Sequence, residues 1–221
     1  MNGLYDIAIF AIPVIIAITL HEAAHGYVAR HFGDNTAAQL GRVTLNPLKH
    51  IDPLGTIALP ALLILTKAGF IFGYARPVPV NFAALRNPKR DMIWVAAAGP
   101  GMNIALGTIS VLLIYVLSHF GINLNGWPLD LLWNSVEINL VLAVLNLLPI
   151  PPLDGSKAVA GILPNTLAVP YWKLQRYGML IVLILFIALP AIGLNLFAPL
   201  VAAPVAAIER PILAFLGIHG T

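Results

Sequence analysis

Two histidines and a glutamate stand close together near the start of the chain, in the run His21-Glu22-Ala23-Ala24-His25. On a helix, residues four apart project from one face, so His21 and His25 can grip the same metal ion. Glu22 is offset by about 100° around such a helix, where its carboxylate can reach an attacking water instead of the metal. This HExxH pattern is typical of zinc-dependent hydrolysis, with the glutamate as general base.

A catalytic zinc site usually takes three protein ligands and leaves one position open. The chain has no cysteine, so the third ligand has to be a histidine or a carboxylate. We favour Asp154, which follows the proline-rich run 149–152. Prolines end a helix and open its backbone, which suits a residue that lines a water-filled cavity. On its own, Asp154 before Gly155 could equally be a turn residue, and only its pairing with the HExxH run favours a ligand.

The residues around these groups are those of a membrane protein. Of the 221 residues, 59% are hydrophobic and only 10% are charged, against a usual charged share of roughly 25%. Too few charges remain to coat a globule in water, and the run from Ile7 to Leu20 has none. Ionisable residues inside an apolar helix normally mark a functional site. The small net charge of +3 gives no nucleic-acid footprint, so no nucleic-acid partner is expected.

The predicted fold is an all-α polytopic membrane protein with five to six transmembrane segments, built as a single domain over residues 1–221. Between the first helix and the helix that starts near residue 91, residues 33–90 form a small β-leaning or re-entrant region. Two proline-punctuated stretches there, 42–46 and 76–81, are expected to be edge strands or extended loops. A ligand loop over 149–156 follows the fourth segment. The expected segments are 5–32, 54–72, 91–119, 129–148, 171–189 and 192–208.

Basic residues indicate the orientation of these segments. The connection after residue 119 has no lysine or arginine, whereas the connections on either side of 54–72 have several. If 54–72 dips into the membrane and returns, every basic cluster falls on one side. Five full spans then predict a multi-pass protein of the cell membrane with its N-terminus outside and its C-terminus in the cytoplasm. Six plain spans are the alternative.

The two motifs together resemble the site-2 protease family of intramembrane zinc metalloproteases. That family pairs HExxH in one transmembrane helix with NxxPxxxLDG in a later one, and here the second motif runs from Asn146 to Gly155. The stretch from Ala98 to Asn103 is also similar to the family's. The resemblance covers most of the chain. No PDZ or CBS domain is visible, so it is to a compact member, although the HExxH run comes unusually early.

The resemblance implies one zinc ion per chain, held by His21, His25 and Asp154, with Glu22 as general base. It implies a substrate that is itself a transmembrane protein, surrounded by membrane lipid. By the same resemblance, Asn146 supports catalysis by donating a hydrogen bond to the developing oxyanion. The alternative for Asn146 is a structural bond between helices.

Other functions fit part of this pattern. A divalent-metal transporter or channel could use the same His and Asp cluster as a transit site, but it gives Glu22 no role. A catalytically inactive scaffold is disfavoured because Glu22 is intact. If Arg30 marks the cytoplasmic interface, His25 lies roughly 8 Å below it along the helix, so the active site is expected to open toward the cytoplasm. The sequence leaves a homo-oligomer open.

Overall fold

The computed structural model describes residues 3–58, 73, 75–122 and 124–217, and helices dominate all of this part. No β-strand forms among these described residues. Five helices are long and apolar enough to cross a membrane. The predicted all-α polytopic membrane fold is therefore confirmed. The five helices are Ile7–His31, Pro88–His119, Trp127–Leu147, Asn165–Ala191 and Ala198–Leu216.

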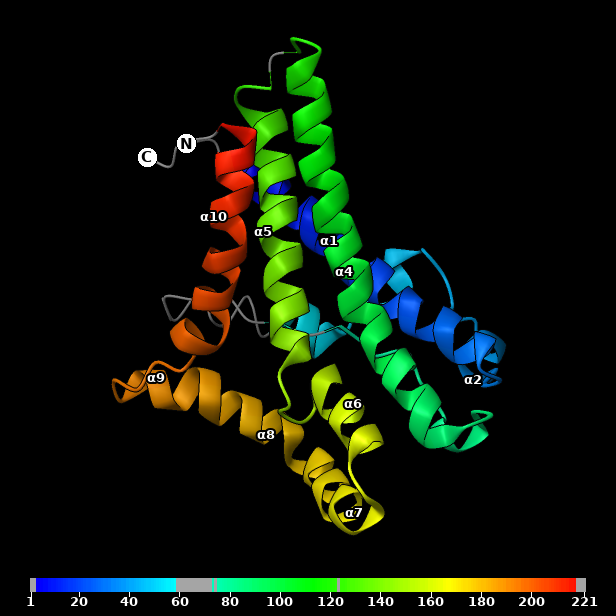
Figure 1. Cartoon of the computed structure of the whole chain (residues 1–221). Coiled ribbons are helices and arrows are strands. Elements are labelled where there is room, and N and C mark those ends of the chain that lie inside the picture. The colour runs from blue at the N-terminus through cyan, green and yellow to red at the C-terminus, as the bar shows by residue number, and fades with distance from the viewer. Residues whose placement is uncertain (1–2, 59–72, 74, 123, 218–221) are drawn as a thin grey trace.

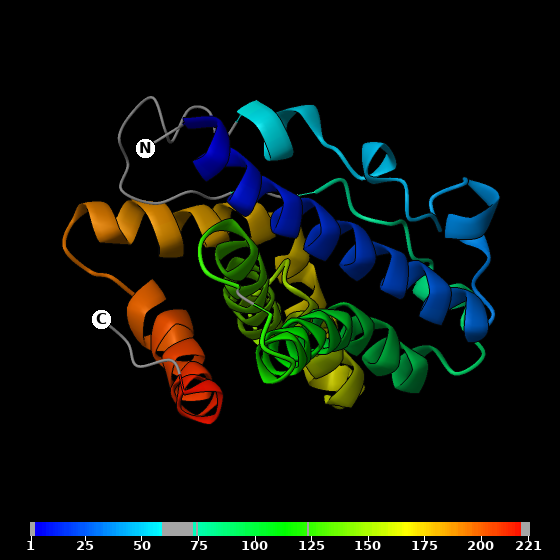
Figure 2. The ribbon, with the colours of Figure 1, turned by 90° about the horizontal axis from the view of Figure 1, so that it is seen from above.

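Three long helices form the centre of the bundle: α1 (Gly3–His31), α4 (Pro88–His119) and α5 (Trp127–Leu147). In Figure 1, α4 and α5 stand side by side and are joined at the top. Seen from above, α1 and α10 (Ala203–Leu216) lie on different sides of this pair (Figure 2). Polar contacts hold the beginning of α1 against α5. The Tyr5 hydroxyl bonds to the Asp130 carboxylate, and Asn134 donates to the Ile9 carbonyl over 3.3 Å.

Local sequence explains where these helices begin and end. The first turn of α4 carries Pro88, whose missing N–H costs nothing there. The Asp91 carboxylate reaches back to accept from the N–H of Asn87 over 2.7 Å, as in a capping box. Helix α5 ends at Leu147, because Pro149 disfavours helical geometry in the residue before it.

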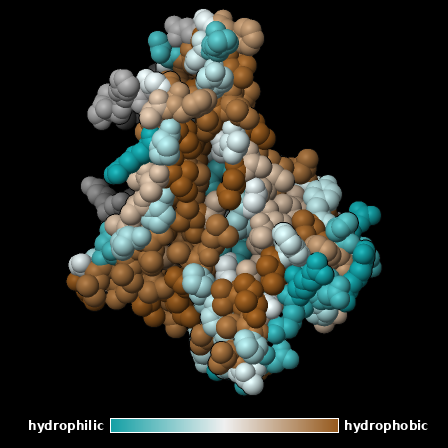
Figure 3. Space-filling view, viewed as in Figure 1, coloured by the Kyte–Doolittle hydropathy of each residue, from teal (hydrophilic) through white to brown (hydrophobic). Residues whose placement is uncertain are grey.

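Buried apolar side chains gather in two clusters. One surrounds the start of α4 with Ala29, Leu85, Met92, Val95 and Ala160. The other joins α4 and α5 to the C-terminal helix with Ile114, Val136, Leu140, Val201 and Val205. Many other large apolar side chains of the helices are exposed. Figure 3 shows them covering much of one face, with hydrophilic residues gathered over α2 (Thr36–Gln39) and the start of α4. Lipid would cover such a surface.

The region between α1 and α4 is built from short elements and extended chain. The stretches 42–46 and 76–81 are not strands, so of the two predicted forms the extended loop is correct. Several backbone groups of the second stretch bond to side chains, and the Arg76 N–H donates to the His50 carbonyl over 2.9 Å. Asn81 N–H donates to Asp34 over 2.7 Å, and Arg42 donates to the Arg76 carbonyl over 2.7 Å. The short helices here are α2, the 3₁₀ turns Pro47–Lys49 and Phe82–Ala84, and the π turn Pro53–Ala58.

Of the predicted segment 54–72, the structure describes residues 54–58, which belong to the π turn Pro53–Ala58. The rest of that segment lies outside the described residues, and so does the choice between re-entrant and fully spanning forms. On its far side, residues 75–81 continue as extended chain into the cavity described below.

After α5 the chain forms α6 (Asp154–Ile162) and then a long composite helix over Asn165–Ala191. In Figure 1 this composite helix crosses the lower end of α5 and does not stand beside it. It begins earlier than the predicted 171–189. It is assembled from α7 (Asn165–Lys173), a 3₁₀ turn (Leu174–Tyr177), α8 (Gly178–Leu183), a π turn (Ile184–Ala188) and α9 (Leu189–Ala191).

The last helix also differs from its predicted bounds of 192–208. Its π turn starts at Ala198, and α10 continues to Leu216. Pro199 lies at one of the first two positions of the π turn, where a missing N–H is tolerated. Pro204 lies within the continuous helix Ala198–Leu216, directly after that π turn.

The end of α10 lies beside the end of α4. The rings of Phe215 and Tyr115 stack with centroids 5.0 Å apart, which places residue 215 near the connection between α4 and α5. The start of α1 lies near the same connection through Tyr5 and Asp130. Both contacts lie near the connection between α4 and α5, and the placement of the two chain ends relative to a membrane stays a prediction.

Candidate metal centre

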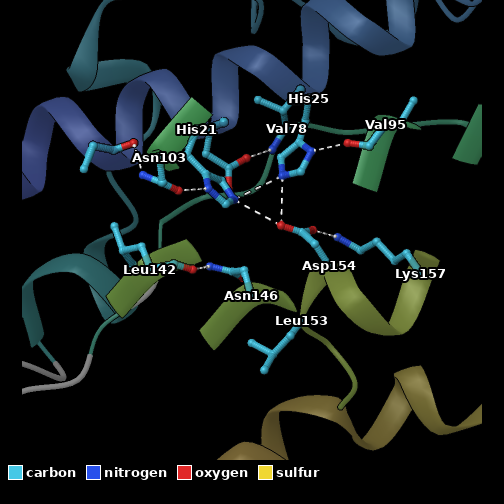
Figure 4. A network of polar contacts seen from close by, with 12 residues as sticks. His21, His25, Val78, Val95, Asn103, Leu142, Asn146, Leu153, Asp154 and Lys157 are labelled. Atoms are coloured by element: carbon cyan, nitrogen blue, oxygen red, sulfur yellow. Dashed lines mark hydrogen bonds and ion pairs between the residues drawn. The ribbon is translucent and has the colours of Figure 1, made fainter. Parts of the chain in front are cut away.

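The three predicted ligands meet at one buried point, as Figure 4 shows. His21 and His25 project from the same face of α1, and their Nε2 atoms lie 3.1 Å apart. Asp154, the first residue of α6, brings its Oδ2 atom to 3.1 Å from His21 Nε2 and 3.0 Å from His25 Nε2. Three ligand atoms from two distant parts of the chain thus form a small, nearly equilateral triangle.

The outer nitrogen of each imidazole is already bonded to an acceptor. His25 Nδ1 donates to the Val95 carbonyl over 2.7 Å, and His21 Nδ1 lies 2.5 Å from Asn103 Oδ1. With the proton on Nδ1, both Nε2 lone pairs face each other and a carboxylate. The triangle has three short contacts, one between the two Nε2 atoms and one from each Nε2 atom to Asp154 Oδ2. A single shared proton could form a hydrogen bond in one of these contacts but not in all three. A metal cation satisfies all of them at once.

The donor set and its spacing fit zinc. Tetrahedral zinc with ligand bonds of roughly 2.0–2.1 Å would hold its ligand atoms about 3.3 Å apart. The three separations of 3.0–3.1 Å are close to that value. Two imidazoles and one carboxylate, with the fourth direction left to water or substrate, are a ligand set used by catalytic zinc sites.

Asp154 is held in its ionised form by its surroundings. Burial opposes its ionisation, but His25, His21 and Lys157 outweigh burial, and the pKa of its carboxyl lies well below the usual range. The Lys157 ammonium donates to Oδ1 over 2.7 Å, which leaves Oδ2 for the triangle. The following Gly155 packs against the carbonyls of Leu147 and Leu148, where a Cβ would collide with backbone.

Helix α4 supplies the back wall of the centre through Gly99. A Cβ at this position would lie 2.5 Å from His21 Nε2 and 2.5 Å from His25 Nε2. A glycine within a helix that crosses other helices is expected to allow close helix packing. In the structure, the group that packs closely on Gly99 is the pair of candidate ligands itself.

Glu22 lies beside the triangle but is not part of it. Its half-buried carboxylate lines the same cavity as both histidines. Oε2 accepts the N–H of Val78 over 2.7 Å, so the extended stretch 75–81 holds this carboxylate in place. Arg42 supports that stretch by donating to the carbonyls of Arg76 and Pro77. Burial and the nearby Arg76 lower the pKa of the Arg42 guanidinium, while Glu22 raises it.

A cavity of about 610 Å³ contains the candidate ligands and Glu22. Its walls come from α1, the stretch 75–82, α4, α5, α6 and α8. Asn146 lines it from α5, and its amide donates to the Leu142 carbonyl of the same helix over 3.0 Å. Asn146 touches none of the three ligands, and its catalytic role stays a prediction.

Three contributors to the centre were missed by sequence reasoning: Lys157, Asn103 and Asn139. Lys157 could have been found from its position three residues after Asp154 on one helix. Asn103 ends the stretch noted for its family resemblance, but nothing in the sequence connects it to His21. Asn139 bonds to Asn103 from another helix, and no local pattern reports such a pairing.

Comparisons with known proteins identify relatives that are named as zinc metalloproteases. A Bacillus subtilis protein, provisionally named zinc metalloprotease YwhC, is 40% identical over 180 residues, which cover 80% of this chain and 78% of that protein. Rip2 of Mycolicibacterium smegmatis, with the same provisional activity in its name, is 32% identical over 81% of this chain and 66% of its own length. A zinc metalloprotease of Methanocaldococcus jannaschii is 26% identical over 74% of this chain and 37% of its own length. No protein-family model and no solved structure matches the chain.

Proposed function

This chain belongs to the site-2 protease-like family of zinc metalloproteases, and we propose that it is an endopeptidase that hydrolyses peptide bonds of membrane-embedded protein substrates. One observation supports this most strongly. A zinc-type triangle and a carboxylate outside that triangle share one cavity inside a bundle of apolar, membrane-length helices. Such a cavity brings hydrolytic groups to a segment that soluble proteases do not reach.

The residues of the triangle would hold the zinc ion: His21, His25 and Asp154. Zinc, when bound, polarises a carbonyl and lowers the pKa of a bound water to roughly 7. Glu22 takes the proton of the attacking water and passes it to the leaving amine. The Val78 N–H fixes one carboxylate oxygen of Glu22 and so sets its direction within the cavity. Asn146, on the cavity wall, is our proposed donor to the oxyanion.

Removal of the metal tests this function. We expect the purified protein in lipid vesicles to cleave a transmembrane peptide, to lose cleavage after dialysis against a chelator, and to regain it when stoichiometric zinc is added. Peptide fragments measured by mass spectrometry report the activity. A chelated protein that still cleaves would contradict the proposal.

The same vesicles separate the proposal from the transporter alternative. A transporter would carry zinc across the vesicle membrane and leave the peptide intact, whereas a protease would cleave the peptide without moving zinc. The names of the relatives favour the protease.

We further propose that the cavity opens toward the cytoplasm in a cell membrane. Basic residues gather where α1 ends and α4 begins, and the connection 120–126 at the other end of α4 has none. By the positive-inside rule the basic end is cytoplasmic. The start of α1 then lies outside, as the charge pattern predicts. The stacking of Phe215 on Tyr115 favours the same side for the end of α10. The basic residues are Arg30, Arg86, Lys89 and Arg90.

Single cysteines can test this orientation, because the chain has none of its own. We expect Asn87→Cys, at the start of α4, to be protected from a membrane-impermeant maleimide added to intact cells. Phe120→Cys, at the other end of the same helix, should react, since this side chain is 76% exposed. The reverse labelling pattern would overturn the orientation and leave the chemistry of the cavity untouched.

A further inference from the structure

A chain of buried polar side chains leads away from the metal centre into the apolar bundle. It starts at His21 on α1, passes through Asn103 on α4 to Asn139 on α5, and ends at Ser135 and Ser110. Asn103 is 0% exposed and Asn139 is 1% exposed. Amide groups so deeply buried among apolar helices are costly unless each is hydrogen-bonded. Each of these buried amides therefore needs its hydrogen-bond partners to remain in place.

One backbone carbonyl fixes the direction of the three bonds that connect Ser135, Asn139, Asn103 and His21. The carbonyl of Ser135 can only accept, so the atom of Asn139 that lies 2.8 Å from it must be the amide nitrogen. Asn139 then presents its oxygen to Asn103, which has to answer with its own nitrogen, over 2.8 Å. Asn103 is left with its oxygen toward His21 Nδ1, at 2.5 Å.

The Asn103 Oδ1 atom beside His21 Nδ1 determines the tautomer of the His21 imidazole. Because Asn103 Oδ1 accepts, His21 carries its proton on Nδ1 and turns the Nε2 lone pair toward Asp154 and His25. His25 obtains the same setting from the Val95 carbonyl, a backbone group that α4 itself fixes. Only His21 depends on a side chain. That side chain is oriented by the shorter bond to Asn139, at 2.8 Å, and by a longer contact of 3.5 Å with the Ala17 carbonyl.

We propose that Asn103, oriented by Asn139, is a positioning residue that holds the His21 imidazole in its metal-binding tautomer and rotamer. The inference rests on the metal site of the proposed function but not on proteolysis. Groups that orient metal-binding histidines are typically worth roughly 10–100-fold in metal affinity. The pairing of α4 with α5 is thereby linked to the metal centre on α1.

The test compares zinc binding among three leucine variants of similar size. Asn103→Leu removes the acceptor of His21, and Asn139→Leu removes only the group that orients it. Asn134→Leu is the matched control. Asn134 also lies on α5 and donates to α1, at the Ile9 carbonyl, but it has no part in the hydrogen-bonded series from His21 to Ser110. Zinc dissociation constants are measured in detergent by competition with a chromophoric chelator, and melting temperatures in parallel.

We expect Asn103→Leu to raise the dissociation constant by roughly 10–100-fold. Asn139→Leu should raise it by a smaller factor, and Asn134→Leu should leave it unchanged. The absorption bands of bound Co²⁺ should shift in Asn103→Leu, since the His21 ring loses its fixed orientation. Asn103→Asp keeps an oxygen acceptor for His21 Nδ1 but sets an oxygen against Asn139 Oδ1, so its dissociation constant should lie between those of Asn103→Leu and the unaltered protein. If Asn103→Leu fails to fold, the comparison of Asn139→Leu with Asn134→Leu decides the question.

Three results would overturn the inference: wild-type zinc affinity in Asn103→Leu, equal losses in Asn103→Leu and Asn134→Leu, or an Asn103→Asp variant as weak as Asn103→Leu. Failure of the proposed function would look different. An unaltered protein that binds zinc tightly but cleaves no peptide would defeat the proteolytic proposal and leave the role of Asn103 standing. An unaltered protein that binds no zinc would defeat both.

Discussion

Replacement of Glu22 by glutamine is expected to lower the cleavage of a transmembrane peptide by roughly 10²–10⁴-fold, the usual contribution of a general acid–base group. The amide has nearly the same shape, and its oxygen can still accept the N–H of Val78. What it cannot do is take a proton from water. Because Glu22 is outside the ligand triangle, the zinc content measured by atomic absorption should stay at one ion per chain.

Glu137→Gln is the matched control for this experiment. Glu137 lies on α5, is exposed, and does not line the cavity, so the same chemical change there should leave cleavage intact. Full cleavage by Glu22→Gln would remove Glu22 from the mechanism. Loss of zinc together with loss of cleavage would mean that Glu22 supports the metal site and is not the base.

Replacement of Asp154 by asparagine should have the second large effect, this time on the metal itself. Binding free energies of roughly 10–16 kcal/mol for structural zinc are shared among about four ligands, so the loss of one anionic ligand should weaken zinc binding by at least about 10²-fold. Cleavage should fall with zinc occupancy. The change also leaves Lys157 without the carboxylate that now lies 2.7 Å from its ammonium. Chelator competition and peptide cleavage, measured on the same sample, check both effects.

Asp130→Asn provides the comparison for Asp154. Asp130 is also an aspartate bonded to another helix, through the Tyr5 hydroxyl, but it lies at the start of α5 and outside the cavity. Its replacement should leave zinc affinity unchanged. Undiminished zinc binding by Asp154→Asn would show that a different group completes the site.

The candidate ligands could be predicted from sequence because short local motifs specify their positions. The spacing of His21 and His25 specifies one helix face, and the prolines before Asp154 specify a helix end. The starts and ends of α1, α4 and α5 fall within a few residues of their predicted bounds for the same reason, since apolar runs and prolines mark them.

Features that depend on how helices meet could not be predicted. The bonds from His21 to Asn103 and on to Asn139 exist because of the rotation of α1, α4 and α5 about their axes, which the sequence does not encode locally. The stretch 76–81 has β-leaning residues but no partner strand among the described residues, so its composition alone could not distinguish an edge strand from an extended loop.

The separation of the ligands along the chain has a consequence for synthesis of the protein. His25 and Asp154 are 129 residues apart, so a ribosome that has delivered α1 to the membrane has supplied two ligand atoms and no complete site. Closure has to wait until α4 and α5 are inserted and α6 packs beneath them. With the site assigned here, the nascent enzyme is inert during the period when it lies among other unfolded transmembrane segments, and it gains activity only as its own folding finishes.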